Sequence, residues 1–185
     1  FAVTSFISNR HYYREQMKKI SFQNDVLPLK NMLYRLALRI TLNNAEAEDI
    51  VQDTLIKVWN NRDNWEKIDS IEAYCLTIAR NLSLDRNKKM DNQHQSIEEK
   101  QIDKPDQSSN PFEDMNRKDL INLIKRLIDE LPEKQRSCIQ LRDFEGNSYK
   151  EIAIVLDITE EQVKINIFRA RQAIKKKYQG FDNYG

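Results

Sequence analysis

The chain has 185 residues, of which 32% are charged, and its formal net charge is +1. This length suits one domain of ordinary size or two small helical ones, and only three glycines and four prolines interrupt it. No apolar run approaches the roughly 20 residues of a transmembrane helix, which excludes direct membrane insertion. Residues 1–16 lack the charged and apolar regions of a signal peptide.

The cysteines and histidines form no metal-binding pattern. Cys75 and Cys138 fall on the apolar faces of predicted helices, which is typical of small core residues in a reducing cytosol, and there is no CxxC pair. His11 and His94 lie in polar segments. The sequence therefore predicts neither a metal site nor a cofactor, and without a convergent His, Cys and carboxylate cluster it does not predict an enzyme.

Three helices are predicted in the first half of the chain. The first has an apolar stripe at helical spacing, formed by Leu29, Leu33, Leu36, Ala37 and Ile40. Asn43 and Asn44 end it and offer an N-cap to the second helix, about residues 45–60. One side of this second helix is apolar, and the other side carries Glu46, Asp49, Gln52 and Asp53.

The rest of the first half is less regular. Residues 60–69 show no repeat and predict a loop that contains Trp65. Asp69 and Glu72 resemble a capping box at the start of a third helix, whose apolar stripe runs from Ile71 to Leu82 and which runs out at residues 85–89. Residues 91–115 are rich in polar residues and contain two prolines, so they cannot bury enough surface to offset their ordering entropy. They predict a flexible linker.

The second half predicts further helices and a helix-turn-helix motif. An apolar stripe runs from Leu120 to Leu131, and Pro132 suits the first position of the next helix, which ends at Glu145-Gly146. A short helix over about 148–156, a turn at Asp157-Ile158 and a second helix after Thr159 then form the motif. Thr159 and Gln162 form a capping box that fixes where the second helix starts.

This second helix has an inward face and a basic outward face. Val163, Ile167, Ala170 and Ile174 recur at helical spacing and point inward. The outward residues, which face solvent or DNA, are Lys164, Ile165, Phe168, Arg169 and Arg171. Six bases and no acid occur between Lys164 and Lys177, which indicates a nucleic-acid face. The alternative is a helical hairpin with a solvated basic face.

Four motifs together resemble the extracytoplasmic-function (ECF) sigma factors, the minimal members of the sigma-70 superfamily. They are DIVQDTLIKVW at 49–59, IARNLSLDR at 78–86, LPE at 131–133, and SYKEIA at 148–153 with the basic helix that follows. The resemblance covers about residues 22–178 and implies an all-α fold of two small helical domains. These are a sigma two helical bundle at 22–90 and a sigma four helix-turn-helix domain at 116–178, joined by the flexible linker 91–115. Residues 1–21 would be an N-terminal extension, non-native in part, and 179–185 a C-terminal tail.

The resemblance also implies a function and its residues. Such a chain binds core RNA polymerase and directs promoter-specific transcription initiation through −10 and −35 recognition and strand opening, in the bacterial cytoplasm. Its partners would be the polymerase β′ clamp helices and β flap, promoter DNA and an anti-sigma factor. The matching polymerase-binding residues are Asp49, Gln52, Asp53 and Leu55. The matching −10 residues are Trp65, which would capture a flipped base, Arg80 and Asn81. The matching −35 residues are Arg142, Lys164, Ile165, Phe168, Arg169 and Arg171.

The sequence departs from the family pattern at three positions of the helix-turn-helix motif. The turn has Asp157 where the family usually has Gly, and Asp tolerates the left-handed conformation. Gln162 and Asn166 stand where the family favours Thr and Arg, so the −35 sequence read by this chain does not follow from the family.

Trp65 has an alternative role as a core residue of the bundle. For the whole chain, the alternative is a helix-turn-helix regulator without polymerase binding, which leaves the acidic helix unexplained.

Overall fold

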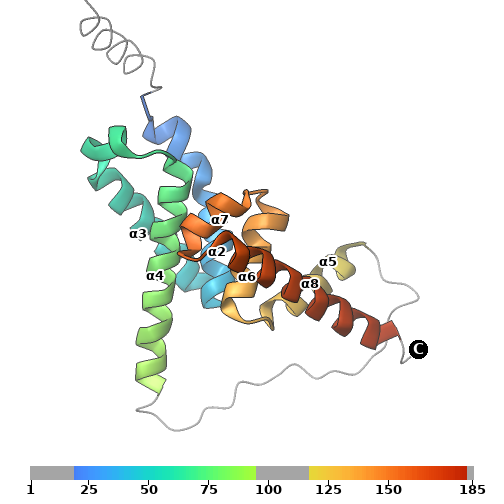
Figure 1. Cartoon of the computed structure of the whole chain (residues 1–185). Helices are drawn as coiled ribbons and strands as arrows, with labels where there is room; N and C mark the ends of the chain where they lie inside the picture. The colour runs from blue at the N-terminus through green and yellow to red at the C-terminus, as the bar shows by residue number, and fades with distance from the viewer. Residues whose placement is uncertain (1–18, 95–116, 183–185) are drawn as a thin grey trace, which may run out of the picture.

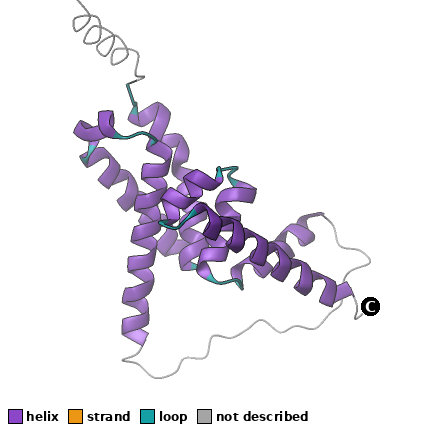
Figure 2. Cartoon of the chain, viewed as in Figure 1, coloured by secondary structure: helices purple, strands orange, loops and turns teal. Residues whose placement is uncertain are grey.

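The computed structural model describes residues 19–94 and 117–182, and these ranges contain helices and no strands (Figures 1 and 2). The all-α prediction is therefore confirmed. The elements in chain order are η1 (Phe22–Val26), η2 (Leu27–Leu29), α2 (Lys30–Thr41), α3 (Asn44–Asn60), η3 (Arg62–Lys67), α4 (Ile71–His94), α5 (Arg117–Asp129), α6 (Glu133–Ile139), η4 (Gln140–Phe144), α7 (Tyr149–Leu156) and α8 (Glu160–Asp182). Residues 1–18, most of the predicted linker (95–115) and residues 183–185 of the predicted tail lie outside the described ranges.

The first module, α2 to α4, is a bundle of three helices packed on one another. Its apolar stripes meet in the core, where Leu33, Leu36 and Ile50 are fully buried, because each stripe lies on one side of its helix. The predicted break between α2 and α3 is confirmed: the Asn43 side chain accepts a hydrogen bond from the Glu46 backbone N–H and caps α3.

Three local predictions for this module are corrected. The loop predicted at 60–69 contains the short helix η3, which is fixed to the core by buried Trp65. The side chain that caps α4 is Ser70, which accepts from the Ala73 N–H at 3.2 Å, and not Asp69. The helix α4 continues to His94, so residues 91–94 are helical. An apolar stripe cannot reveal this extension, because polar residues dominate it.

The second module, α5 to α8, confirms the helix-turn-helix prediction and adds detail. Pro132 immediately precedes α6 rather than occupying its first position. One further turn, η4, continues α6, and Gly146 follows with a φ of 80°, which suits a residue without Cβ. The inward face of α8 is confirmed, because Val163, Ile167 and Ala170 are buried.

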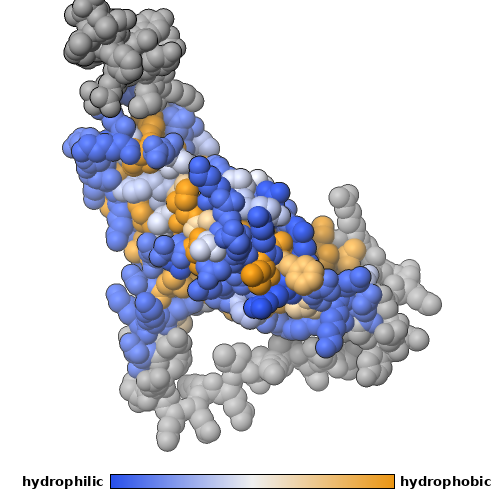
Figure 3. All heavy atoms as spheres, in the orientation of Figure 1, coloured by the Kyte–Doolittle hydropathy of each residue, from blue (hydrophilic) through white to orange (hydrophobic). Residues whose placement is uncertain are grey.

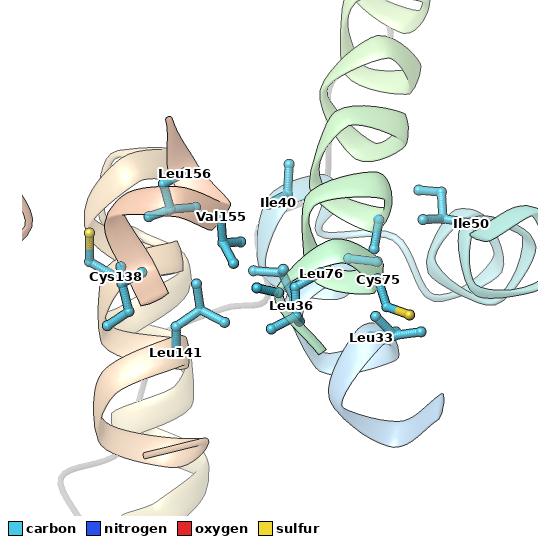
Figure 4. Close-up of a cluster of buried hydrophobic side chains, with 14 of the residues drawn as sticks. Leu33, Leu36, Ile40, Ile50, Cys75, Leu76, Cys138, Leu141, Val155 and Leu156 are labelled. Atoms are coloured by element: carbon cyan, nitrogen blue, oxygen red, sulfur yellow. The ribbon is translucent and has the colours of Figure 1, made fainter. Parts of the chain in front are cut away.

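The two modules pack directly against each other, which the sequence did not predict. Helix α7 lies against α4, and α6 lies against α2. Figure 4 shows Leu36, Ile40 and Leu76 of the first module facing Leu141 and Val155 of the second. These side chains belong to one continuous buried cluster that runs through both modules. The described part of the chain therefore has a closed arrangement.

Candidate polymerase and DNA interfaces

The outward face of α3 presents the residues predicted to bind polymerase. Asp49 and Gln52 are exposed, whereas Leu55 is half-buried and packs against the core. Asp53 is half-buried, and its carboxylate accepts from the Arg86 guanidinium at 3.2 Å. Arg86 also pairs with Glu46 at 2.8 Å. Asp53 therefore already contributes to the contact between α3 and α4, while Asp49 and Gln52 are free to meet a partner.

Two large apolar side chains extend this outward face and were missed in the sequence. Ile56 is 57% exposed and Trp59 is 46% exposed, although both lie in an ordered helix. They follow Asp49 by seven and ten residues, which is the helical spacing that places them on its side. This helical spacing from Asp49 is the sequence signal that could have identified Ile56 and Trp59 as part of the face. The α3 face is therefore polar at its start and apolar towards its end.

A hollow of about 380 Å³ lies beside this face, between α2 and α3. Gln52 and Leu55, both predicted polymerase-binding residues, help to line it. The other lining residues are Lys30, Asn31, Tyr34, Glu48 and Val51. A side chain of a partner protein could enter this hollow while the partner contacts Asp49.

Trp65 has a packing role in this structure. Its side chain is only 8% exposed, and its Nε1–H donates to the Val58 carbonyl at 3.2 Å. The indole also stacks on the Phe22 ring, with the centroids 6.4 Å apart. These contacts favour the alternative interpretation, in which Trp65 is a core residue. Stacking on a flipped base would require η3 to move away from the bundle.

The remaining predicted −10 residues are adjacent on α4. Asn81 is exposed, and its Oδ1 accepts from Arg80 Nη1 at 3.1 Å. The Arg80 Nε is buried without a hydrogen-bond partner within the described residues. A bound DNA strand could therefore replace the Arg80–Asn81 hydrogen bond by new bonds to either side chain.

Reciprocal hydrogen bonds fix both helices of the helix-turn-helix motif. The Thr159 N–H donates to Gln162 Oε1 at 2.9 Å and the Gln162 N–H donates to Thr159 Oγ1 at 3.2 Å, which confirms the predicted capping box. A second capping box, Ser148 with Glu151, starts α7; its S-x-x-E spacing was readable in the sequence. The hydrogen bond from the Ser148 backbone N–H lowers the pKa of Glu151. Asp157 is left-handed, with a φ of 52°, as predicted for the turn.

The six residues predicted for −35 recognition divide into two groups. Lys164, Ile165, Phe168 and Arg169 lie exposed on α8. Arg171 is exposed too, but its guanidinium donates two hydrogen bonds to Asp143, which raise its pKa. Arg142 donates to the Asn147 carbonyl at 2.8 Å and lies over the Tyr149 ring. The first four residues are therefore exposed to a partner, although the Lys164 ammonium also lies over the Tyr149 ring, 5.9 Å from its centroid. Arg142 and Arg171 also stabilise the module.

Within residues 19–94 and 117–182, no three or more His, Cys, Asp or Glu side chains gather as a metal site would need. In those ranges, no helix is long and apolar enough to span a membrane.

Known proteins resemble the chain over both modules. The family models "Sigma-70 region 2" and "Sigma-70, region 4" match residues 26–92 and 121–174. The RNA polymerase sigma-H factor of Pseudomonas aeruginosa is 28% identical over 169 residues, covering 87% of this chain and 88% of that protein. The ECF RNA polymerase sigma-E factor of Salmonella typhimurium is 30% identical over 142 residues, covering 72% and 74%.

Solved structures agree with these sequence relatives. The sigma factor RpoE of Bartonella quintana, in complex with the anti-sigma factor NepR, has a TM-score of 0.67 and 25% identity over 85% of this chain and 96% of that one. CnrH in complex with the cytosolic domain of CnrY has a TM-score of 0.62 at 19% identity, over 91% and 94%, and supports the fold alone. With regions 2 and 4 both present and in order, this chain belongs to the ECF RNA polymerase sigma factors of the sigma-70 family.

Proposed function

We infer that this chain binds core RNA polymerase and carries it to promoters, where the two modules direct initiation from −10 and −35 elements. The observation that carries this inference is the presence of two different binding surfaces in one chain. One is the acidic and apolar face of α3, and the other is the basic outward face of α8. The role is binding and positioning rather than catalysis, in the cytoplasm of a bacterium.

The α3 face suits a basic protein surface with an apolar centre, as proposed for the β′ clamp helices. Asp49 supplies a charge that steers a cationic partner. Ile56 and Trp59 supply the apolar area that a stable interface buries at its centre. Gln52 and Leu55, beside the hollow, lie between these two parts of the face. The β flap is the proposed polymerase contact of the second module.

The DNA contacts are proposed on α4 and α8. Asn81, with Arg80, would read or hold the −10 strand, and strand opening would follow. Lys164, Ile165, Phe168 and Arg169 would read the −35 element, because the second helix of this motif enters the major groove by its N-terminal part. Arg142 would hold a phosphate and Arg171 would contact DNA only by exchanging its Asp143 partner.

Simultaneous binding of both elements requires the modules to separate. The names of the −10 and −35 elements imply a separation of about 25 base pairs, which corresponds to about 85 Å along B-DNA. A compact chain of 185 residues has a radius of gyration of only about 16 Å. The closed arrangement therefore represents a state that precedes promoter binding.

An anti-sigma factor is a further proposed partner. One solved relative, the sigma factor RpoE of Bartonella quintana, is bound to the anti-sigma factor NepR. A partner of this kind would bind this chain when it is not bound to polymerase and would stabilise that unbound state. Its binding would compete with the α3 face or with the opening of the two modules.

The proposed function is tested by run-off transcription with core polymerase on a library of promoters, together with a core-binding assay at moderate salt. We expect promoter-specific transcripts and expect Asp49→Lys to weaken core binding without changing the circular dichroism spectrum. Asp49 is a better test than Asp53, whose reversal would also break the pair with Arg86. Asp63→Lys, at an exposed acid of η3, is the matched control. DNA binding without any affinity for core polymerase would instead identify the alternative, a helix-turn-helix regulator.

A further inference from the structure

We propose that Ile165 and Phe168 form a pair that reads thymine methyl groups, so that the −35 element of this chain requires thymines facing them. The inference rests on the proposed function and specifies what the α8 surface selects. The expected preference for thymine depends on the side chains that α8 exposes and on the hydrogen bonds that these side chains make.

The pair occupies the outermost line of α8. Phe168 is 63% exposed, the largest exposure of any large apolar residue in the described ranges, and Ile165 is 48% exposed. At 100° per residue, both lie roughly opposite the buried line through Val163 and Ile167. Figure 3 shows the corresponding apolar patch on α8, bordered by hydrophilic surface. A patch in this position contacts the molecule to which the outward face of α8 binds.

Two amide side chains beside this pair, those of Gln162 and Asn166, are engaged in local hydrogen bonds. Gln162, which could otherwise bond adenine, accepts through its Oε1 from the Thr159 N–H in the helix cap. Asn166 donates its amide to the Gln162 carbonyl at 2.8 Å. Since Gln and Asn recognise adenine by bidentate bonds, their local bonds weaken that kind of readout here. On the outermost line of the helix, Ile165 and Phe168 lie between the exposed polar residues Glu161 and Gln172.

Thymine offers the chemistry that fits the pair. Its C5-methyl is the apolar group of the major-groove code, and apolar side chains contact it. The pair is flanked on α8 by exposed cations, Lys164 and Arg169, which attract phosphates or guanine. This combination of an apolar centre and cations, on the helix that follows the motif's turn, favours DNA over a protein as the occupant.

The test uses the full chain in complex with core polymerase and removes the methyl groups from the DNA. The −35 element is first selected from a random pool, and each thymine in it is then replaced by deoxyuridine, which lacks only the methyl. We expect enriched thymines, and a loss of about four-fold in affinity for each methyl that is buried, from the transfer free energy of one such group. Ile165→Ala and Phe168→Ala should each abolish the difference between thymine and deoxyuridine at one position.

Two controls separate this result from general weakening. Ile154→Ala changes an equally exposed apolar residue on α7 and should leave the ratio of thymine to deoxyuridine affinity unchanged. Lys175→Ala should weaken both DNAs alike. The inference is overturned if core-dependent transcription occurs but deoxyuridine binds as well as thymine, or if both α8 variants keep the wild-type ratio; the patch would then be a protein contact. Absence of core-dependent transcription would overturn the proposed function itself.

Discussion

Replacing Glu145 with alanine is expected to release the two modules from each other. The Glu145 side chain is only 3% exposed, and its two oxygens accept hydrogen bonds from Arg35 of the first module, both at 2.7 Å. Gln140 also donates to Glu145 at 2.7 Å, and in turn accepts from Arg39 Nε at 3.0 Å. Glu145 is thus the centre of a polar network that joins α2 to η4.

The size of the effect follows from burial. Removal of one partner of a fully buried ion pair costs about 3–5 kcal/mol. The Arg35 side chain is 47% exposed, so water compensates part of its loss and about 1–3 kcal/mol is a better estimate. This free energy corresponds to about a 5- to 150-fold change in the ratio of closed to separated modules.

Energy transfer between two dyes, one on each module, measures this ratio. Exposed Lys57→Cys and Lys176→Cys provide the attachment sites. The native Cys75 and Cys138 will not compete, because burial raises the pKa of each thiol to about 12 and keeps it protonated. Glu145→Ala should lower transfer efficiency. Asp143→Ala, which breaks an ion pair with Arg171 inside the second module, should not. Equal transfer in wild type and Glu145→Ala would refute the assigned role of the network.

Three other predictions follow from the site geometry. Trp65→Ala should lower the free energy of unfolding by about 3–5 kcal/mol in urea titrations. Trp59→Ala removes a half-exposed ring in edge contact with Phe22, so it should lower this free energy by less and should also weaken core binding. Asn81→Ala should retain polymerase binding and −35 recognition but reduce permanganate reactivity of −10 thymines, and wild-type strand opening would contradict its −10 role. Lys176→Ala should weaken binding to all DNA sequences about equally and lower the slope of log affinity against log salt by about one. Arg169→Ala should reduce the binding free energy for the cognate −35 sequence by roughly 1–3 kcal/mol if this residue reads a base. Identical behaviour of the two variants would exclude direct readout by Arg169.

Periodicity predicted those parts of the fold that depend on neighbouring residues. The inward face of α8, the cap at Thr159 and the left-handed Asp157 are all determined within a few residues, so the sequence pattern contains the information. The outward position of Ile165 and Phe168 follows from the same pattern. Their contact with DNA stays a prediction.

Features that depend on distant residues escaped the sequence pattern. The helical extension of α4 is supported by Arg86, whose partner Glu46 is 40 residues away. The contact between modules includes Arg39 with Gln140, which are 101 residues apart. Ile40 belongs to the stripe of α2, but periodicity could not show that this part of the stripe lies near the second module. Pairings of this kind are determined by tertiary packing rather than by local spacing.

The composition of the contact between modules explains how a stable resting state can still open. Apolar packing favours closure, but the contact also buries polar groups at a cost. Desolvation lowers the pKa of Arg136, whose Nε donates to the Arg39 carbonyl across the contact. Asn147 bonds Glu72 of the first module while its own Oδ1 lacks a partner within the described residues, and such a group costs about 1–3 kcal/mol. These penalties offset part of the hydrophobic gain, as in other contacts between domains of one chain. Binding free energy from polymerase and DNA can therefore exceed the remaining stability of the closed state.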